Sequence, residues 1–147
     1  MKDFYSYIAI FSFDSDGISI EFPDLPGCFS CANSYEEAYV NAEEALSLHL
    51  YGMEQVGECF PEPRTVDDIN LENNERTALI RVNMTLMRAK IENVSIKKTL
   101  TIPAYLNVWG EQNGINFSRV LQEGIIAMMN GERVIDTKKL SIISIRI

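Results

Sequence analysis

The side chains able to carry chemistry are few and widely spaced in this chain of 147 residues. Cys28 and Cys31 have the C-x-x-C spacing of redox and zinc sites. Residues three apart on an extended strand point to opposite faces, however, and the sequence has no second ligand pair. We therefore expect small buried side chains here rather than a metal or disulfide centre. His49, the single histidine, has no nucleophile motif beside it, so we expect a structural role.

The carboxylates do not form a hydrolytic pattern either. Hydrolysis with two metal ions needs three or four converging acids. The segment Tyr5–Phe13 has none before Asp14 and Asp16, and Thr77–Leu86 has none. We expect no enzyme, catalytic residue, metal or cofactor, and metal-dependent cleavage by the pure protein would be needed to revive nuclease activity as an alternative.

The polar side chains with the clearest spacing lie between Val94 and Ile102. Lys97, Thr99 and Thr101 fall on one face of an extended strand, and the other face is largely apolar. Lys and Thr side chains on a two-stranded ribbon can contact base edges in the major groove of DNA. The spacing therefore predicts a DNA-reading strand.

Two helices are expected to follow this strand. Pro103 suits the start of the first helix, and Asn113–Gly114 suits its end. Either Asn116 or Ser118 caps the second helix, whose first N–H groups could bind a phosphate. The apolar stripe of this helix comprises Phe117, Val120, Leu121, Ile125 and Met128.

A strand and two helices of about 35 residues bury too little apolar surface to fold alone. Antiparallel pairing of two copies would satisfy the free strand edge and close a shared core of four helices. We therefore expect a homodimer, or a dimer of dimers, that presents the three polar strand residues twice. The alternative is a strand–helix–helix segment that completes a single α+β domain.

The N-terminal part of the chain has a different pattern. Apolar or alternating segments bounded by turn residues predict strands over Tyr5–Phe13, Ile18–Phe22, Cys28–Ala32 and Thr77–Leu86. After the third strand, a capping box of Ser34 and Glu37 opens a helix that runs to Gly57, and a polar loop follows to Arg76. The predicted order is β-β-β-α-β.

Charge also differs along the chain. Residues 1–78 contain three Lys or Arg and 16 Asp or Glu, a net of −13, whereas residues 79–147 contain ten and five, a net of +5. The acidic half suits a basic protein partner, while the basic half can approach phosphates. We expect a cytoplasmic protein without a membrane partner, because no apolar run is long enough to span a bilayer, no signal pattern is present and three cysteines suit a reducing compartment.

The stretch from Val94 to Ile125 resembles the ribbon-helix-helix family of bacterial repressors. The resemblance rests on the strand alternation, Pro103, the Gly114-x-Asn116-x-Ser118 turn and the apolar stripe of the second helix. It covers about a quarter of the chain.

The N-terminal part resembles the N-terminal domain of HicB antitoxins. The matching features are Tyr7-x-Ala9, the segment F-P-D-L-P-G-C that begins at Phe22, and the pattern E-E-A-x-x-N-A that begins at Glu36. With the C-terminal stretch included, the resemblance to this family covers nearly the whole chain up to Ile125.

The resemblance implies an α+β protein of two domains and a tail. Residues 1–90 would form a partial, degenerate ribonuclease H-like domain that binds and neutralises a HicA-like mRNA-cleaving toxin. Residues 91–130 would form a ribbon-helix-helix domain that binds operator DNA as a dimer and represses the protein's own operon. Residues 131–147 have no counterpart in the resemblance, and an added strand, a disordered tail and an interaction segment all stay open. The alternative function is a stand-alone ribbon-helix-helix transcription regulator with a sensor or protein-binding N-terminal domain.

Two sets of site residues follow. The expected toxin contacts lie around the third strand and the helix start and comprise Asp24, Leu25, Phe29, Tyr35 and Glu36, although a structural turn around Pro23 and Pro26 would explain part of the same pattern. The expected DNA contacts comprise Lys97, Thr99, Thr101, Asn116 and Ser118.

Overall fold

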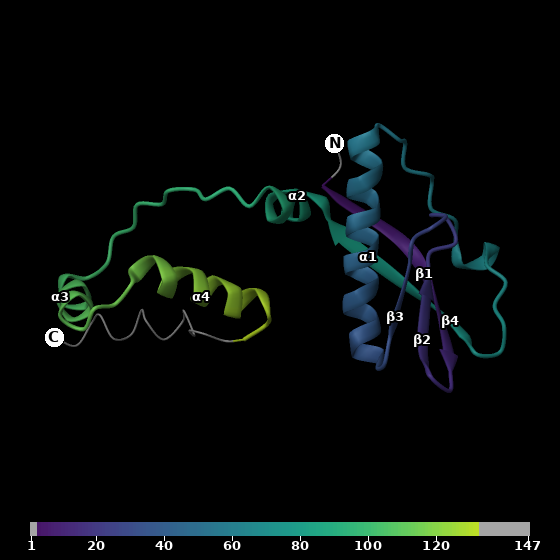
Figure 1. The fold of residues 1–147 in the computed structure, drawn as a ribbon, viewed down its shortest axis with the longest axis horizontal. Helices are drawn as coiled ribbons and strands as arrows, with labels where there is room; N and C mark the ends of the chain where they lie inside the picture. Colours follow the sequence, from purple (N-terminus) through teal and green to yellow (C-terminus); the bar gives the residue numbers. More distant parts are fainter. Residues whose placement is uncertain (1–2, 133–147) are drawn as a thin grey trace. The chain divides into compact units, whose positions relative to one another are not determined.

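The computed structural model describes residues 3–132 (Figure 1). The chain divides into two compact units after Ile96. The N-terminal unit contains a sheet and two α-helices, and the C-terminal unit contains two α-helices. The predicted tail falls almost entirely outside the described residues.

The N-terminal unit is built on an antiparallel sheet with the strand order β3-β2-β1-β4. The strands are β1 (Phe4–Asp14), β2 (Gly17–Glu21), β3 (Phe29–Ala32) and β4 (Glu75–Asn83). A tight turn joins β1 to β2, with Asp14 opposite Gly17, and β1 pairs along its other edge with β4. The sequence predicted these four strands and their order along the chain, but not their order in the sheet.

One long helix, α1 (Tyr35–Val56), covers one face of the sheet (Figure 1). Its first turn is fixed by Ser34, whose side chain accepts a hydrogen bond from the backbone N–H of Glu37, as the predicted capping box requires. The Glu37 carboxylate binds the backbone N–H of Asn33. The helix ends at Gly57, whose φ of 74° is the left-handed conformation that glycine adopts most easily.

The core of this unit lies between α1 and the sheet. Small residues at Ala38 and Ala42 bring the helix close to the strands, and Leu46 and Leu50 continue the same stripe. The strands contribute alternate residues, which are buried because their side chains all point to the α1 face; they include Tyr7, Ala9, Phe11, Ile18, Ile20, Ala78, Ile80 and Val82. The core explains why the β-β-β-α-β order was predictable from apolar periodicity.

The loop between α1 and β4 is irregular apart from a short 3₁₀ turn, η1 (Val66–Asp68). The hydroxyl of Tyr7 donates a hydrogen bond of 2.7 Å to the carbonyl oxygen of Pro61. Burial of this phenol raises the pKa of Tyr7, and the nearby Asp24 carboxylate raises it further. The loop is thus attached to the sheet as well as to the elements at its ends.

The strand predicted over Thr77–Leu86 is wrong at its C-terminal end. β4 stops at Asn83, and an unpredicted helix, α2 (Met84–Glu92), follows at once. The Asn83 side chain caps this helix by accepting a hydrogen bond from the backbone N–H of Leu86. Met84 is buried in the core, so the apolar alternation of the strand passes into the helix without a break.

The strand predicted over Val94–Ile102 is not present in the single chain. Residues 93–103 form neither helix nor strand. A strand is defined by hydrogen bonds to a neighbouring strand, and the described part of this chain supplies no such neighbour. The prediction had placed the strand's partner on a second copy of the chain.

The two helices predicted in the C-terminal unit are present. α3 (Ala104–Gln112) begins directly after Pro103, and α4 (Phe117–Met129) follows a short turn that contains Gly114. Gly110 of α3 is buried against the ring of Phe117, and a Cβ at this position would overlap that ring. The Phe117 ring thus occupies the space that a side chain at position 110 would need.

None of the described helices combines the length and the apolar character needed to cross a membrane.

Candidate functional site

Asp24 and Leu25, two of the expected toxin contacts, lie in the turn with the sequence PDLPG and are held inside the N-terminal unit. The Asp24 carboxylate accepts hydrogen bonds from Nε of Arg64, at 2.5 Å, and from the backbone N–H of Arg64, at 3.1 Å. Its side chain is 5% exposed, and Leu25 is 1% exposed. The structural turn around Pro23 and Pro26 accounts for both residues: Asp24 anchors the α1–β4 loop through Arg64, Leu25 is buried in the core, and in this conformation neither side chain offers surface to a partner.

Phe29 lies on the other face of the sheet from α1. Phe29 is 72% exposed, and its cross-strand partner is Glu21. The next residue but one, Cys31, is on the same exposed face. Phe29 is therefore accessible, but it is separated by the sheet from the helix that carries Tyr35 and Glu36.

Tyr35 and Glu36 are exposed in the first turn of α1. The Tyr35 ring stacks on Phe13 of β1, with 6.2 Å between the ring centroids and 12° between the planes. The five expected toxin contacts thus fall into three places: an internal anchor, one face of the sheet, and the helix start. The structure does not bring them together as one site.

Two exposed aromatic residues near Tyr35, namely Phe13 and Tyr39, were not among the expected contacts. Tyr39 lies four residues after Tyr35, so the two rings share one face of the helix, and their centroids are 5.6 Å apart. The i, i+4 spacing of two tyrosines at a helix start could have revealed this pair. Their proximity to Phe13 depends on the tertiary fold.

The three expected DNA contacts of the C-terminal unit, Lys97, Thr99 and Thr101, are all exposed. They alternate with apolar side chains that are also exposed, by 78% at Ile96 and 61% at Leu100. Apolar side chains so open to solvent in an extended segment lack the packing that burial would provide. The structure leaves both faces of this segment without a neighbour in the described chain.

Asn116, rather than Ser118, caps α4. Its Oδ1 accepts a hydrogen bond of 3.0 Å from the backbone N–H of Arg119, while Ser118 is exposed in the first turn. The first N–H groups of a helix have no partner within it, so this end of α4 keeps a partial positive charge near both expected residues.

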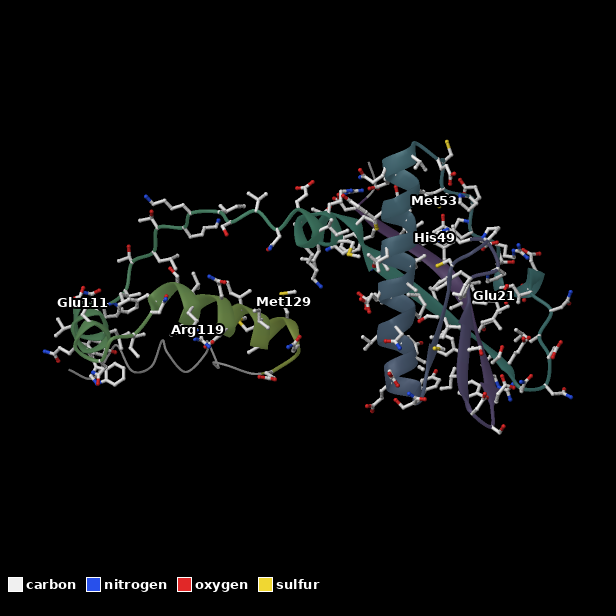
Figure 2. The ribbon with its side chains drawn as sticks, in the orientation of Figure 1. Glu21, His49, Met53, Glu111, Arg119 and Met129 are labelled. Atoms are coloured by element: carbon white, nitrogen blue, oxygen red, sulfur yellow. The ribbon has the colours of Figure 1, made fainter. Side chains whose placement is uncertain are left out.

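The predicted apolar stripe of α4 is exposed along its whole length. Its members Phe117, Val120, Leu121, Ile125 and Met128 are between 37% and 66% exposed, and Trp109 of α3 is 59% exposed. Arg119 and Glu123, which pair at 2.7 Å, lie one turn apart on the same helix (Figure 2). The C-terminal unit thus has helices with apolar faces but no core of its own to bury them.

The cysteines do not form a pair. The two thiols point in opposite directions, as predicted. Cys28 is buried, but the expectation of a buried side chain is wrong for Cys31, which lies on the exposed face of β3. Burial raises the pKa of the Cys28 thiol to about 11, which keeps it protonated and unreactive at neutral pH. Between Asp3 and Glu132, no group of three or more His, Cys, Asp or Glu side chains is placed to hold a metal ion.

His49 lies on the side of α1 nearer the strands (Figure 2). It is half-buried, and its Cε1 is 4.0 Å from the position that a Cβ on Gly27 would occupy. It therefore packs beside the PDLPG turn.

Residues 6–123 match the family described as HicB-like antitoxin of bacterial toxin-antitoxin system. A protein of 14.9 kDa from the rep-hol intergenic region of Haemophilus phage HP1, described as uncharacterized, is 34% identical over 95 residues, which are 63% of this chain and 68% of the phage protein.

Solved structures also resemble the chain. A chain of a toxin–antitoxin complex from Streptococcus pneumoniae is 21% identical, with a TM-score of 0.52, and the match covers 85% of this chain and 99% of that chain. A crystal structure of the antitoxin HicB3 is 25% identical, with a TM-score of 0.47, over 84% of this chain and 97% of that chain. The first likeness shows that the mixed α+β fold is shared.

Proposed function

The chain belongs to the family of HicB-like antitoxins of bacterial toxin-antitoxin systems, and we propose that it neutralises a small HicA-like toxin and represses its own operon. The observation that carries this proposal is the extent of the family match. It runs from residue 6 to residue 123 and includes both the acidic unit and the extended segment with Lys97. The acidic unit and the segment with Lys97 therefore both lie within the region that matches the antitoxin family. The role is a binding role, without catalysis.

The N-terminal unit is the part that binds the toxin. Its β-β-β-α-β order agrees with a partial ribonuclease H-like domain. The net charge of −13 over residues 1–78 would attract a toxin that binds RNA and is therefore basic. The acidic unit would cover the toxin's RNA-binding surface, and its charges would speed association and set specificity more than raw affinity.

The C-terminal unit is the part that dimerises. Two copies of residues 94–102 would pair as antiparallel strands and satisfy each other's backbone groups. The four helices of the pair would bury the stripe of α4 and the exposed side chain of Trp109. This arrangement is a ribbon-helix-helix fold, and the exposed apolar side chains of the single chain support it because burying them is favourable by roughly 25 cal/mol per Å².

The paired strands are the part that reads DNA. Lys97, Thr99 and Thr101 would face the major groove from both strands, and the N-terminus of α4 at Asn116 and Ser118 would hold a backbone phosphate. An operator complex of this kind loses affinity steeply as salt rises, because phosphate contacts release counterions.

Co-expression with the small toxin-like gene beside this one tests the antitoxin role. We expect the small protein alone to stop growth, and we expect this chain to restore growth and to co-purify with it. If the small protein is not toxic and operator binding is still observed, the chain is a stand-alone ribbon-helix-helix regulator instead.

A double substitution separates the two roles. Lys97→Ala with Thr99→Ala is expected to abolish operator binding in a mobility-shift assay, because it removes four side chains from the dimer's paired strands. Toxin neutralisation by the same variant should be unchanged. Loss of both activities would contradict the division of labour between the units.

A further inference from the structure

Four aromatic side chains of the N-terminal unit form a continuous group, here called the aromatic cluster: Phe11, Phe13, Tyr35 and Tyr39. Phe11 is buried beneath the others, with its ring centroid 6.0 Å from that of Tyr35 and 5.7 Å from that of Tyr39. The cluster joins the C-terminal end of β1 to the first two turns of α1. It is therefore held by two elements of regular structure.

Three rings of the cluster remain open to solvent. Phe13 is 38% exposed, Tyr35 is 54% exposed and Tyr39 is 42% exposed. Because Phe11 supports them from the core, these rings are already in place before a partner arrives, which lowers the entropy cost of binding.

Within residues 3–132, no Arg or Lys lies over these rings. The aromatic ring of Phe4 provides the contrast, because the guanidinium carbon of Arg81 lies 4.3 Å from its centroid. The ring of Phe4 is thus used within the unit, whereas the rings of the aromatic cluster are available to cations from outside.

Acidic residues accompany the cluster on α1. Glu36 follows Tyr35 and Glu43 lies one helical turn after Tyr39, whereas Asp14 alternates to the other face of β1 and its Oδ1 accepts a hydrogen bond from Asn74 Nδ2. The cation on the same face of the sheet is Arg76, which is opposite Phe11, and its Nη1 donates hydrogen bonds to the carbonyl oxygens of Asn73 and Glu75. Aromatic rings among carboxylates suit positively charged side chains.

We propose that the aromatic cluster is the surface on which the basic toxin docks, with Arg or Lys side chains of the toxin lying over Tyr35, Tyr39 and Phe13. The inference rests on the proposed antitoxin function and assigns toxin binding to the aromatic cluster of the N-terminal unit. The occupant is a cationic protein because the rings attract cations and residues 1–78, which include the aromatic cluster, carry a net charge of −13. The docking surface lies on the α1 side of the sheet, away from Phe29.

The test compares three variants of the full chain by titration calorimetry against a catalytically inactive toxin from the neighbouring gene. Tyr35→Leu with Tyr39→Leu removes the π faces and keeps apolar side chains over Phe11, so we expect binding to weaken about 10-fold or more. Tyr35→Phe with Tyr39→Phe keeps both rings and should bind like the wild type. Leu79→Ala, which removes an exposed side chain on the opposite face of the sheet, should also bind like the wild type.

Each other result overturns the inference. Unchanged binding of the double leucine variant, confirmed as folded by circular dichroism, excludes the cluster. Loss of binding in Leu79→Ala alone moves the toxin to the other face of the sheet. Equal loss in the leucine and phenylalanine pairs assigns the effect to the hydroxyl groups rather than to the rings. If the wild-type chain itself does not bind the toxin, the antitoxin proposal fails first, and this inference falls with it.

Discussion

The two units of the chain handle apolar residues in opposite ways. Every buried apolar side chain in the described structure lies between Tyr7 and Met84 and is at most 8% exposed. In the C-terminal unit, the buried residue is Gly110, and the stripe of α4 is at least 37% exposed. Both units have clear apolar periodicity, so periodicity alone does not tell where the partner surface is. The N-terminal unit finds that surface within its own chain, and we propose that the C-terminal unit finds it on a second copy of the chain.

The ion pairs follow the same division. Arg64 and Arg88 of the N-terminal unit each contact a carboxylate distant in sequence, whose side chain is only 5% or 12% exposed. The described pair of the C-terminal unit, Arg119 with Glu123, is i, i+4 on one helix and is 76% and 62% exposed. Exposed pairs of this kind contribute a few tenths of a kcal/mol at most. The described ion pairs between residues distant in sequence thus lie in the unit that we propose binds the toxin.

The first prediction tests the comparison by removing a side chain from the buried core of the N-terminal unit. Leu46→Ala removes a side chain that is 0% exposed and lies between α1 and the sheet. We expect the free energy of unfolding of the N-terminal unit to fall by about 2–5 kcal/mol, as for other buried leucines. Urea denaturation followed by circular dichroism measures it. Leu48→Ala, on the same helix at 50% exposure, should change it by less than about 0.5 kcal/mol, and equal effects of the two would mean that the core does not lie where the structure places it.

Most of the N-terminal fold was predictable because the forces that set it are local. A few neighbouring residues determine each of three features: the turn at Asp14–Gly17, the helix cap at Ser34 and the helix end at Gly57. Helix α2 was not predicted because Met84 continues the apolar alternation of β4. The side chain of Asn83, which caps the helix, is by itself a weak sign that a helix begins there.

The candidate site was less predictable because it depends on contacts between distant residues. Asp24 is engaged by Arg64, 40 residues away, and no local pattern indicates that pairing. The sequence placed Leu25 on a turn, but the fold turns its side chain into the core. The aromatic cluster likewise needs β1 and α1 to meet before Phe13 can reach Tyr35.

The second way to sharpen the comparison is to test whether the open stripe is a dimer core. Ile125→Asp would place an unpaired charge in that core, which costs several kcal/mol. We expect the dimer to dissociate into monomers, with a dissociation constant raised at least about 100-fold, as measured by light scattering after size exclusion. Glu123→Gln, on the same helix, should leave the dimer intact. A variant at Ile125 that stays dimeric would mean that the chain associates through another surface.

The smallest expected effect concerns the ion pair that fixes α2 to α1. Arg88 binds Glu54 through both carboxylate oxygens, with Nη2–Oε1 at 2.5 Å and Nε–Oε2 at 2.9 Å. The hydrogen bond from Arg88 lowers the pKa of Glu54 below its ordinary value. We expect Glu54→Gln to lower the free energy of unfolding by about 1–2 kcal/mol at pH 7, the usual contribution of a charge-assisted hydrogen bond.

The pH dependence of that difference identifies its cause. A carboxylate whose pKa is lowered in the folded state stabilises the fold above its unfolded pKa of about 4.3, and this contribution is lost as the pH falls through the folded value. Urea titrations between pH 7 and pH 3 should therefore show the wild type converging on Glu54→Gln as the solution becomes acidic. Glu123→Gln, which removes the exposed pair of α4, should follow the wild type at every pH. A gap between wild type and Glu54→Gln that stays constant with pH would assign the loss to packing around α2 rather than to the charge of Glu54.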